Sequence, residues 1–306
     1  MEKKYLEIID ARKAYSEGNN VTELLRIQNG ININTPDIIE VAYDLQAGTY
    51  IDFVTEHHND ASLFATEVGK ILDNNITHGD TLLDIGAGEL TTLSLVLSSM
   101  EMRPSEIFAF DISWSRIYKG ISFAKNNMGV DYKNLKAFVG DISEIPLHDK
   151  SINVTTSCHA LEPNGGKLKE LLLELFRVTI DKLVLFEPCY EINSEKGKAR
   201  MDKLGYIKDI EGVVKKLGGE IIEIFKIENS INELNPTACF IIKPPVIADQ
   251  TINKDTGGYS LPGTNMSLKK VGDFYHSIET GLTFPILKGI PVIKSKCAVL
   301  ATSLTK

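Results

Sequence analysis

Between residues 81 and 243, short apolar runs alternate with longer stretches in which apolar side chains recur every three or four residues. The short runs have the length of buried strands, and the longer stretches have the period of helices that pack on one side. Strands that alternate with helices form βαβ units, so the pattern predicts a mainly parallel sheet with helices on both faces. This doubly wound α/β fold would have strands at residues 81–85, 107–111, 136–139, 152–156, 182–186, 220–227 and 238–242.

The regions that flank these alternating units have different patterns. The last two strand candidates are joined by a turn-like link at residues 232–236 rather than by a helix, which predicts a terminal antiparallel hairpin. Residues 246–265 are rich in Gly, Thr, Asn and Asp, as expected of a linker. We therefore expect an N-terminal helical region (residues 1–60), an α/β domain (61–245), and a linker with a small β-rich extension (246–306).

Charge and composition narrow the choice of partners. Hydrophobic residues make up 43% of the chain and charged residues 24%, which is ordinary for a folded protein and excludes wholesale disorder. The formal net charge is −8, so long-range attraction to a phosphate backbone is not favoured. We therefore expect a small-molecule partner rather than a nucleic acid.

Neither a membrane segment nor an export signal is expected. No window approaches the roughly 18 uninterrupted apolar residues of a membrane-spanning helix, and the charged start of the chain lacks the apolar core of a signal peptide. The four cysteines lie far apart with no CxxC pair, which argues against a zinc knuckle or a disulfide framework and fits a reducing cytosol. These features predict a cytoplasmic protein.

The strongest local signal is a glycine turn directly after the first strand candidate. Gly86 and Gly88 let the backbone approach a ligand closely, because a Cβ there would clash. A dinucleotide site would favour a third glycine at the position of Thr91. Asp84 and Glu89 place acids before and within the turn, where a pyrophosphate would be repelled. The turn therefore favours a ligand with an ammonium and a sulfonium over a dinucleotide.

Two further acids end the next two strand candidates. Asp111 ends the second, where its carboxylate can accept hydrogen bonds from both hydroxyls of a ribose, and Ile112 or Trp114 beyond it is placed to cover an adenine face. Asp141, followed by Ile142, ends the third strand and is expected near the adenine amino group. Each acid alone could cap a helix or lie solvated in a loop. Three acids at three successive strand ends nevertheless favour a nucleoside site.

With these residues assembled, the chain resembles the class I S-adenosylmethionine (SAM)-dependent methyltransferases. Residues 82–89 look like the first motif of that family, 108–111 like the second, 139–147 like the third, and 150–157 like its fourth strand. The resemblance covers roughly residues 60–243. It implies a Rossmann-like sheet of seven strands with the last strand antiparallel, SAM as the cofactor, and S-adenosylhomocysteine as the product.

The resemblance also assigns residues to each part of the cofactor. The methionine part would be lined by residues of the first strand and its turn: Asp84, Gly86 and Gly88. Asp111 would bind the ribose and Asp141 the adenine, with Glu89, Ile112 and Ile142 as neighbouring contacts. Helices before the first strand often cover the cofactor in this fold, so residues 1–60 would form a lid with Gln46 and Tyr50 as its contacts. Leu90 departs from the family, because many members have a further glycine there.

The methyl acceptor is expected beyond the fourth strand, near His159 and Glu162. His159 is the natural general base, since the ordinary pKa of histidine is near 6.5, and Glu162 would orient it or bind the acceptor. Glu187 and Tyr190, after the fifth strand, are further candidate contacts. The alternatives are a packed loop histidine, a helix-capping Glu162, and a turn fixed by Pro188. No metal site is expected, because the two adjacent histidines at residues 57–58 lack a third ligand of suitable spacing.

The C-terminal extension more faintly resembles a small zinc-ribbon-like domain, through the sequence motif at residues 284–291. In several methyltransferase systems such a domain is a partner or a fused extension. The cysteines that would bind the metal are absent, and Cys297 lies beyond the motif, so no zinc is expected. Packing would then replace the metal, and the extension would buttress the catalytic domain or form the contact of a homodimer.

These features lead to one main hypothesis and three alternatives. The main one is a methyltransferase that acts on oxygen or nitrogen of a small polar acceptor, such as a sugar or nucleotide sugar of a bacterial surface-polysaccharide pathway. An aromatic-lined pocket would instead indicate a quinone or another apolar acceptor, but the loop near the site is polar. An RNA methyltransferase would need a basic groove between the extension and the site. An NAD-dependent enzyme is disfavoured by Thr91 and Glu89. A non-catalytic protein would bind SAM without turnover on any acceptor.

Overall fold

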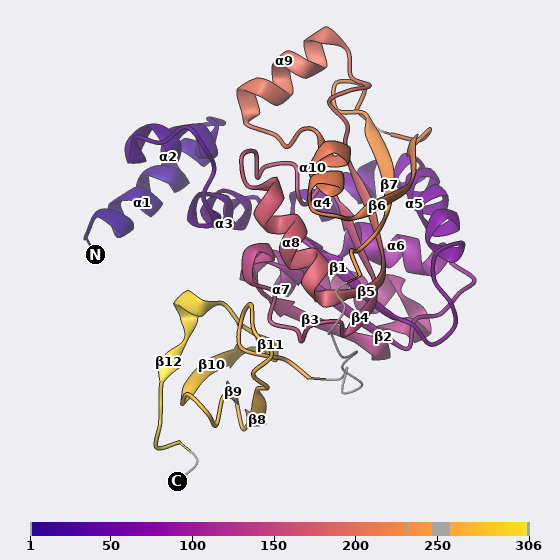
Figure 1. Cartoon of the computed structure of the whole chain (residues 1–306). Coiled ribbons are helices and arrows are strands. Elements are labelled where there is room, and N and C mark those ends of the chain that lie inside the picture. The colour runs from indigo at the N-terminus through magenta and orange to yellow at the C-terminus, as the bar shows by residue number, and fades with distance from the viewer. Residues whose placement is uncertain (1, 231, 247–257, 305–306) are drawn as a thin grey trace.

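The computed structural model describes residues 2–230, 232–246 and 258–304 (Figure 1). Its centre is a seven-stranded sheet with the order β3-β2-β1-β4-β5-β7-β6. β7 pairs antiparallel with β5 and β6, and the remaining neighbours are parallel. The strands are β1 (Thr81–Ile85), β2 (Glu106–Asp111), β3 (Leu135–Val139), β4 (Ile152–Cys158), β5 (Thr179–Pro188), β6 (Glu220–Lys226) and β7 (Thr237–Lys243). The predicted α/β fold, with its antiparallel last strand, is confirmed.

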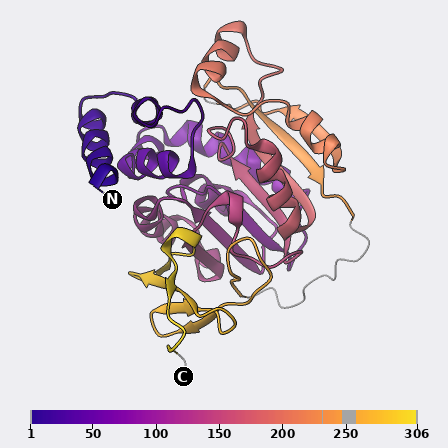
Figure 2. The same ribbon diagram turned by 60° about the vertical axis from the view of Figure 1, so that its left-hand side comes forward.

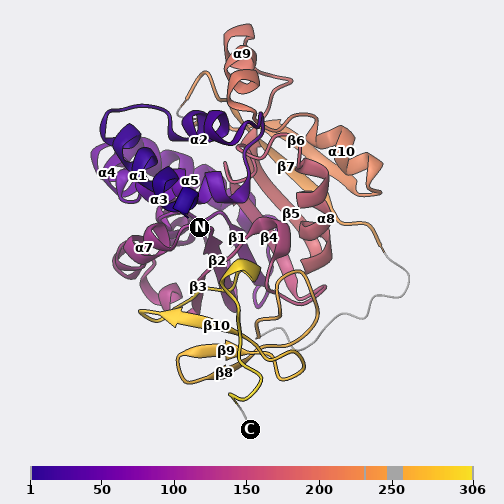
Figure 3. The ribbon, with the colours of Figure 1, turned by 90° about the vertical axis from the view of Figure 1, so that its left-hand side faces the viewer.

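Helices cover both faces of this sheet (Figure 3). α8 (Leu168–Val178) and α10 (Ile210–Lys216) lie on one face. α5 (His58–Asp73), α6 (Thr91–Ser99) and α7 (Trp114–Asn127) lie on the other. Alternate residues of β1 therefore pack into different cores: Leu83 lies on the α8 side and Leu82 on the α6 side. Every residue of β1 is buried for this reason.

Four helices precede the α/β domain: α1 (Glu2–Ser16), α2 (Val21–Asn29), α3 (Pro36–Leu45) and α4 (Thr49–Glu56). α1, α2 and α3 form a group at one side of the sheet (Figure 2), with Ala11, Leu25 and Ala42 buried in a small core of their own. Asp44 attaches α3 to the start of α7, because its carboxylate accepts hydrogen bonds from Ser113 Oγ (2.7 Å) and Ser115 Oγ (3.0 Å).

The C-terminal extension is a small antiparallel sheet at one edge of the main sheet (Figure 1). Its strands are β8 (Lys269–Val271), β9 (Phe274–His276), β10 (Leu282–Leu287), β11 (Ile290–Pro291) and β12 (Val299–Leu300). Val292 forms a parallel bridge with Val139 of β3, and Ile293 N donates a hydrogen bond to Val139 O (2.9 Å). The extension thus covers part of the edge strand, which would otherwise present unpaired backbone groups.

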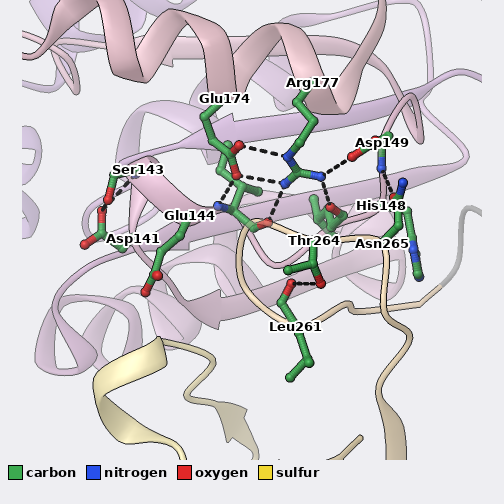
Figure 4. A network of polar contacts seen from close by, with 12 residues as sticks. Asp141, Ser143, Glu144, His148, Asp149, Glu174, Arg177, Leu261, Thr264 and Asn265 are labelled. Atoms are coloured by element: carbon green, nitrogen blue, oxygen red, sulfur yellow. Dashed lines mark hydrogen bonds and ion pairs between the residues drawn. The ribbon is translucent and has the colours of Figure 1, made fainter. Parts of the chain in front are cut away.

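A polar network centred on Arg177 holds the β3–β4 connection (Figure 4). Arg177 donates to Asp149 (2.7 Å) and to Glu174 (2.8 Å), and Glu174 also accepts from Ile145 N (2.6 Å). The extension joins at Asn265, which accepts from Asp149 N (2.6 Å). Its buried apolar residues share the core with α8: Tyr259, Leu261, Leu268, Phe284 and Ile293. Within the described ranges, no group of three or more His, Cys, Asp or Glu could hold a metal ion.

Some elements differ from the sequence prediction. α9 (Glu195–Leu204) was not predicted, because it buries only Gly197 and Met201 and so has no apolar stripe. The strand expected at residues 220–227 ends one residue earlier, at Lys226. Most of the predicted linker, residues 247–257, lies outside the described residues. The remaining short helices are η1 (Gly129–Asn134), η2 (Ile142–Glu144) and η3 (Ser295–Cys297). None of the helices described is long and apolar enough to cross a membrane.

Candidate functional site

The glycine turn after β1 has the backbone conformation for which glycine is suited. Gly86 has φ 58° and Gly88 has φ 55°, both in the left-handed region. A Cβ at Gly86 would lie 2.5 Å from Ala160 Cβ, and one at Gly88 would lie 2.4 Å from the Arg116 guanidinium. The glycines therefore admit side chains of the protein itself, in addition to any ligand.

Leu90 follows the turn with φ 57°. The left-handed conformation costs a residue with a Cβ roughly 1–2 kcal/mol. The Leu90 side chain is completely buried in the core beneath α6, and burial of a leucine contributes about 1.5–3 kcal/mol. The two effects are of similar size, so packing offsets the strain at this departure from the family pattern.

Asp111 closes the turn from the end of β2. Its Oδ2 accepts a hydrogen bond from Gly88 N (3.0 Å), and its Oδ1 accepts one from Ser113 N (2.9 Å). The residue is 5% exposed and lines a small cavity. Because a carboxylate oxygen can accept about two hydrogen bonds, each oxygen keeps capacity for a hydroxyl of a ligand.

This small cavity, which we name the strand-end cavity, has a volume of about 70 Å³. Residues from the ends of β1, β2 and β3 form its floor: Gly86, Asp111, Ile112, Asp141 and Ile142. All of these were predicted as cofactor contacts. Pro36, Ile39 and Tyr43 of α3 line the same cavity. α3 is therefore the part of the N-terminal region that lies over these strand ends.

Asp141 combines two of the roles considered for the acids. It is the N-cap of η2, since its Oδ1 accepts hydrogen bonds from Ser143 N (2.9 Å) and Ser143 Oγ (2.7 Å). The same residue lines the strand-end cavity. The capping interpretation therefore holds for Asp141 and leaves the predicted ligand contact open.

The other two acids of the turn do not line the strand-end cavity. Glu89 is 1% exposed and accepts hydrogen bonds from Gly48 N and Ile51 N (2.9 Å each), which satisfies the first turn of α4. Asp84 is buried, and burial together with the charge of Asp111 raises its pKa to about 8. Asp84 is therefore mostly protonated at neutral pH and does not supply the negative charge expected of it.

Arg116 was not predicted, although its guanidinium lies at the centre of the site. The guanidinium carbon is 4.6 Å from the Tyr50 ring centroid and 5.3 Å from that of Tyr43. Glu89 and Asp111 each lie 3.7 Å from its nitrogens. Burial acts to lower the pKa of Arg116, but the charge of Asp111 and its other neighbours outweigh burial, and the pKa is raised. This buried cation balances the two carboxylates.

A second cavity of about 810 Å³ adjoins the first. We name it the aromatic cavity, because its wall includes six aromatic residues: Tyr15, Tyr43, Tyr50, Phe53, Phe64 and Tyr206. The predicted lid residues Gln46 and Tyr50 line this cavity rather than the strand-end cavity. Tyr43, His159 and Pro163 line both.

His159 lies just beyond β4, between the two cavities. Its Nδ1 is 2.9 Å from Glu162 Oε2, and its Nε2 is 2.8 Å from Thr237 Oγ1. Because the carboxylate can only accept, neutral His159 carries its proton on Nδ1, and Nε2 accepts from the Thr237 hydroxyl. Burial acts to lower the pKa of His159, but the hydrogen bond and the charge of Glu162 outweigh it and raise the pKa.

The backbone at His159 is also unusual, with φ 57°. Left-handed conformations of residues other than glycine are uncommon and gather at functional sites, where the surrounding structure enforces them. Glu162 receives a further hydrogen bond from Asn235 Nδ2 (3.1 Å), which fixes its position beside the imidazole. The alternative in which Glu162 caps the next helix does not apply, because the N-cap position of α8 is Lys167.

Glu187 does not line either cavity. It is completely buried, and its Oε1 accepts hydrogen bonds from Ser157 Oγ (2.7 Å), Ala160 N (3.0 Å) and Leu161 N (3.0 Å). Burial raises the pKa of Glu187 to about 7. The structure thus places Glu187 beneath the loop that carries His159, as a support for that loop.

Tyr190 also lies outside both cavities. Its hydroxyl is 3.4 Å from Asp202 Oδ2, and the Lys208 ammonium lies 4.6 Å from its ring centroid. These partners belong to the segment around α9, so Tyr190 is not brought together with His159.

Several lining residues gave no signal in the sequence. Thr237 and Asn235 lie more than 70 residues after His159 and Glu162 in the chain, and they reach them only because β7 lies beside β5. Arg200 and Tyr206 line the aromatic cavity from α9 and the residues after it. Such contacts follow from the antiparallel insertion of β7 and from an unpredicted helix, rather than from a local motif.

No family model and no curated protein matches this sequence. Among solved structures, it is similar to a chain of the complex between the Haloferax volcanii Trm112 methyltransferase activator and a methyltransferase (TM-score 0.47, 14% identity, 57% of this chain and 86% of that chain). It is also similar to a SAM-dependent methyltransferase from Aquifex aeolicus (TM-score 0.45, 16% identity, 57% and 88%). A third is the geranyl diphosphate C-methyltransferase from Streptomyces coelicolor (TM-score 0.44, 10% identity, 57% and 74%).

Proposed function

We propose that this chain is a SAM-dependent methyltransferase. The observation that supports this most strongly is the strand-end cavity, in which Gly86, Asp111 and Asp141 meet from the ends of three neighbouring strands. Open α/β sheets bind ligands at this edge, with an acid after the second strand to receive the ribose hydroxyls. Asp111 keeps acceptor capacity on both oxygens for that purpose.

The residues of the strand-end cavity suit an adenosine group chemically, but the volume of this cavity is smaller than that group requires. Small-molecule sites typically have volumes of roughly 300–1,000 Å³, whereas the strand-end cavity has about 70 Å³. Pro36, Ile39 and Tyr43 of α3 lie over it, and we propose that α3 moves when the ligand binds. When bound, SAM supplies a methyl group on a sulfonium, which a nucleophile can accept.

His159 is the proposed general base. Glu162 holds Nδ1–H, which leaves the Nε2 lone pair for the proton of an acceptor that displaces the Thr237 hydroxyl. The imidazolium that forms is stabilised by the Glu162 carboxylate. Glu187 positions the loop through its bonds to Ala160 and Leu161.

The residues of the site also bear on NAD and RNA as alternative ligands. Glu89 no longer argues against NAD, because its carboxylate is already hydrogen-bonded to backbone N–H groups at the start of α4. Thr91, in place of the third glycine of a dinucleotide site, still argues against NAD. For RNA, the described residues that line the two cavities include Arg116 and Arg200 but no lysine. This lining provides no basic groove for a phosphate backbone.

The test is calorimetric titration of the full chain with S-adenosylhomocysteine and with NAD. We expect micromolar binding of S-adenosylhomocysteine and none of NAD. Asp111→Ala should weaken the adenosyl ligand about 100-fold, because it removes a charged hydrogen-bond acceptor. Asp181→Ala, at the opposite end of the sheet, is the matched control, and thermal unfolding verifies that both variants are folded. Binding of NAD, or unchanged affinity in folded Asp111→Ala, would contradict the proposal.

A further inference from the structure

The volume and the lining of the aromatic cavity indicate which kind of methyl acceptor fits it. Its volume of about 810 Å³ lies within the range of small-molecule sites. Three of its aromatic side chains keep over a third of their surface uncovered: Tyr15 (36%), Tyr50 (44%) and Phe53 (36%). Single exposed apolar residues are ordinary, but several rings that share one concave wall indicate a flat apolar ligand.

The charges on this wall are few. Among the described residues that line it, the ionisable acidic and basic side chains are His159, Glu162 and Arg200. The diphosphate of a nucleotide sugar would call for several cations, and Arg200 is the one arginine or lysine among the described residues of this wall. The wall therefore disfavours a nucleotide sugar through its scarcity of cations, while uncharged hydrogen-bonding side chains such as Asn34, Gln46 and Thr92 share it with the rings.

Two residues of the wall hold buried acceptor atoms that a ligand hydroxyl could satisfy. Among the described residues, neither Asn34 Oδ1 nor Asn235 Oδ1 has a hydrogen-bond partner, although each of the two asparagines is only 5% exposed. Their orientation is fixed, because the Asn34 amide nitrogen donates to Pro163 O (2.8 Å) and that of Asn235 to Glu162 (3.1 Å). A buried acceptor without a partner costs about 1–3 kcal/mol, which a ligand hydroxyl would recover.

The base beside these groups suits one kind of hydroxyl. Glu162 raises the pKa of His159 above its ordinary value. A phenol has a pKa near 10, whereas the pKa of an aliphatic hydroxyl is far higher and closer to that of water. Proton transfer to an imidazole is therefore far less uphill from a phenol, which is the condition under which a general base is effective.

We infer that the acceptor is a small phenol, an aromatic ring with at least one ionisable hydroxyl and a second polar substituent. This inference rests on the proposed function. The ring packs on the aromatic wall, and Asn34 Oδ1 or Asn235 Oδ1 accepts a hydrogen bond from a second hydroxyl. The reacting O–H bond breaks and its proton moves to His159 Nε2. The phenol oxygen forms a bond to the methyl carbon as the bond between that carbon and the SAM sulfur breaks, and the electron pair of the broken bond stays on sulfur. The products are an aryl methyl ether and S-adenosylhomocysteine.

The test uses the full chain saturated with S-adenosylhomocysteine and titrated with caffeate, a dihydroxylated aromatic acid. The matched ligand is cinnamate, which has the same ring and carboxylate but no hydroxyl. UDP-glucose and a single-stranded RNA oligonucleotide represent the other acceptor classes. We expect saturable binding of caffeate, at least about tenfold tighter than that of cinnamate because hydroxyls satisfy buried acceptors. With SAM in place of the product, mass spectrometry should detect the addition of one methyl group to caffeate.

Phe53→Ala removes an exposed ring from the wall and should weaken caffeate about three- to tenfold, the value of one aromatic contact. Its control is Leu63→Ala on α5, where the side chain is 57% exposed and does not line the cavity. Absence of caffeate binding, or preference for UDP-glucose or RNA, while S-adenosylhomocysteine still binds, would overturn the phenol inference alone. Caffeate binding without any adenosyl binding would support the site and overturn the proposed function.

Discussion

The strand-end cavity and the aromatic cavity adjoin one another, yet they are built from different parts of the chain. The floor of the first comes from short segments directly after β1, β2 and β3, and Asp111 bonds to the backbone of the glycine turn beside it. The wall of the second combines side chains from α1, α4, α5, α9 and the start of β7. Backbone turns at adjacent strands recognise one constant group, whereas added helices form a wall that can vary with the acceptor.

The two cavities also differ in the charged groups around them and in how far other elements cover them. Near the strand-end cavity, Asp111 and Glu89 face the buried Arg116, and α3 covers the floor. The aromatic cavity has an uncovered wall and far more space. Tyr43 and His159 line both cavities, so they are the places where occupancy of one could affect the other.

The largest expected effect separates the chemical step from cofactor binding. His159→Gln should lower kcat about 10²–10⁴-fold, the usual contribution of a general base, with S-adenosylhomocysteine affinity unchanged. Glu162→Gln should lower kcat less and move the acid limb of the pH–rate profile to lower pH. The reason is that the base must be neutral, and removal of the Glu162 charge lowers the pKa of His159.

The measurement is the pH dependence of methyl transfer to caffeate, together with calorimetry. Glu170→Gln is the matched control, because Glu170 is exposed on α8 and lines neither cavity. An acid limb that stays in place in Glu162→Gln would show that His159 is not the base. Loss of adenosyl binding in His159→Gln would show that the two cavities do not act separately.

The same division explains what could be predicted from the sequence. Asp111 and Asp141 were found because parallel strands bring their carboxyl ends together, so spacing along the chain predicts a shared site. The α4 backbone that binds Glu89 and the burial that raises the pKa of Asp84 could not be predicted, because neither is a local property of the sequence. Thr237 had no signal, because its contact with His159 depends on the position of β7 in the sheet.

A smaller effect concerns the closure of α3. Lys294 from the extension lies 2.8 Å from Glu40 of α3 and donates to Ile112 O (3.2 Å). Lys294→Ala should loosen α3 and speed the association of S-adenosylhomocysteine about two- to fivefold, as expected for a partly exposed ion pair. Hydrogen exchange over residues 36–45 should rise in parallel.

Lys296→Ala is the control, because the side chains of both Lys296 and its partner Asp37 are exposed, so this ion pair should contribute less. Equal effects of the two substitutions, or none, would contradict a specific role of Lys294 in holding α3.

The smallest expected effect on binding is that of Asp84→Asn. Burial, together with the charge of Asp111, raises the pKa of Asp84 from its ordinary 3.8 to about 8. The folded chain thus holds a proton that the unfolded chain releases, and the stability of the wild type falls as pH rises between these two values. Asparagine has no proton to lose, so the Tm advantage of Asp84→Asn should grow from pH 5 to pH 8 and level off above, by about 2–4 °C for each kcal/mol. Glu187, with its pKa also raised by burial, to about 7, is present in both proteins and cancels in the difference.

Adenosyl affinity at pH 7 should change less than about twofold, because the wild-type group is already mostly neutral. A large loss of that affinity would instead show that the Asp84 carboxylate binds the ligand, and the strand-end cavity would then extend beneath the glycine turn.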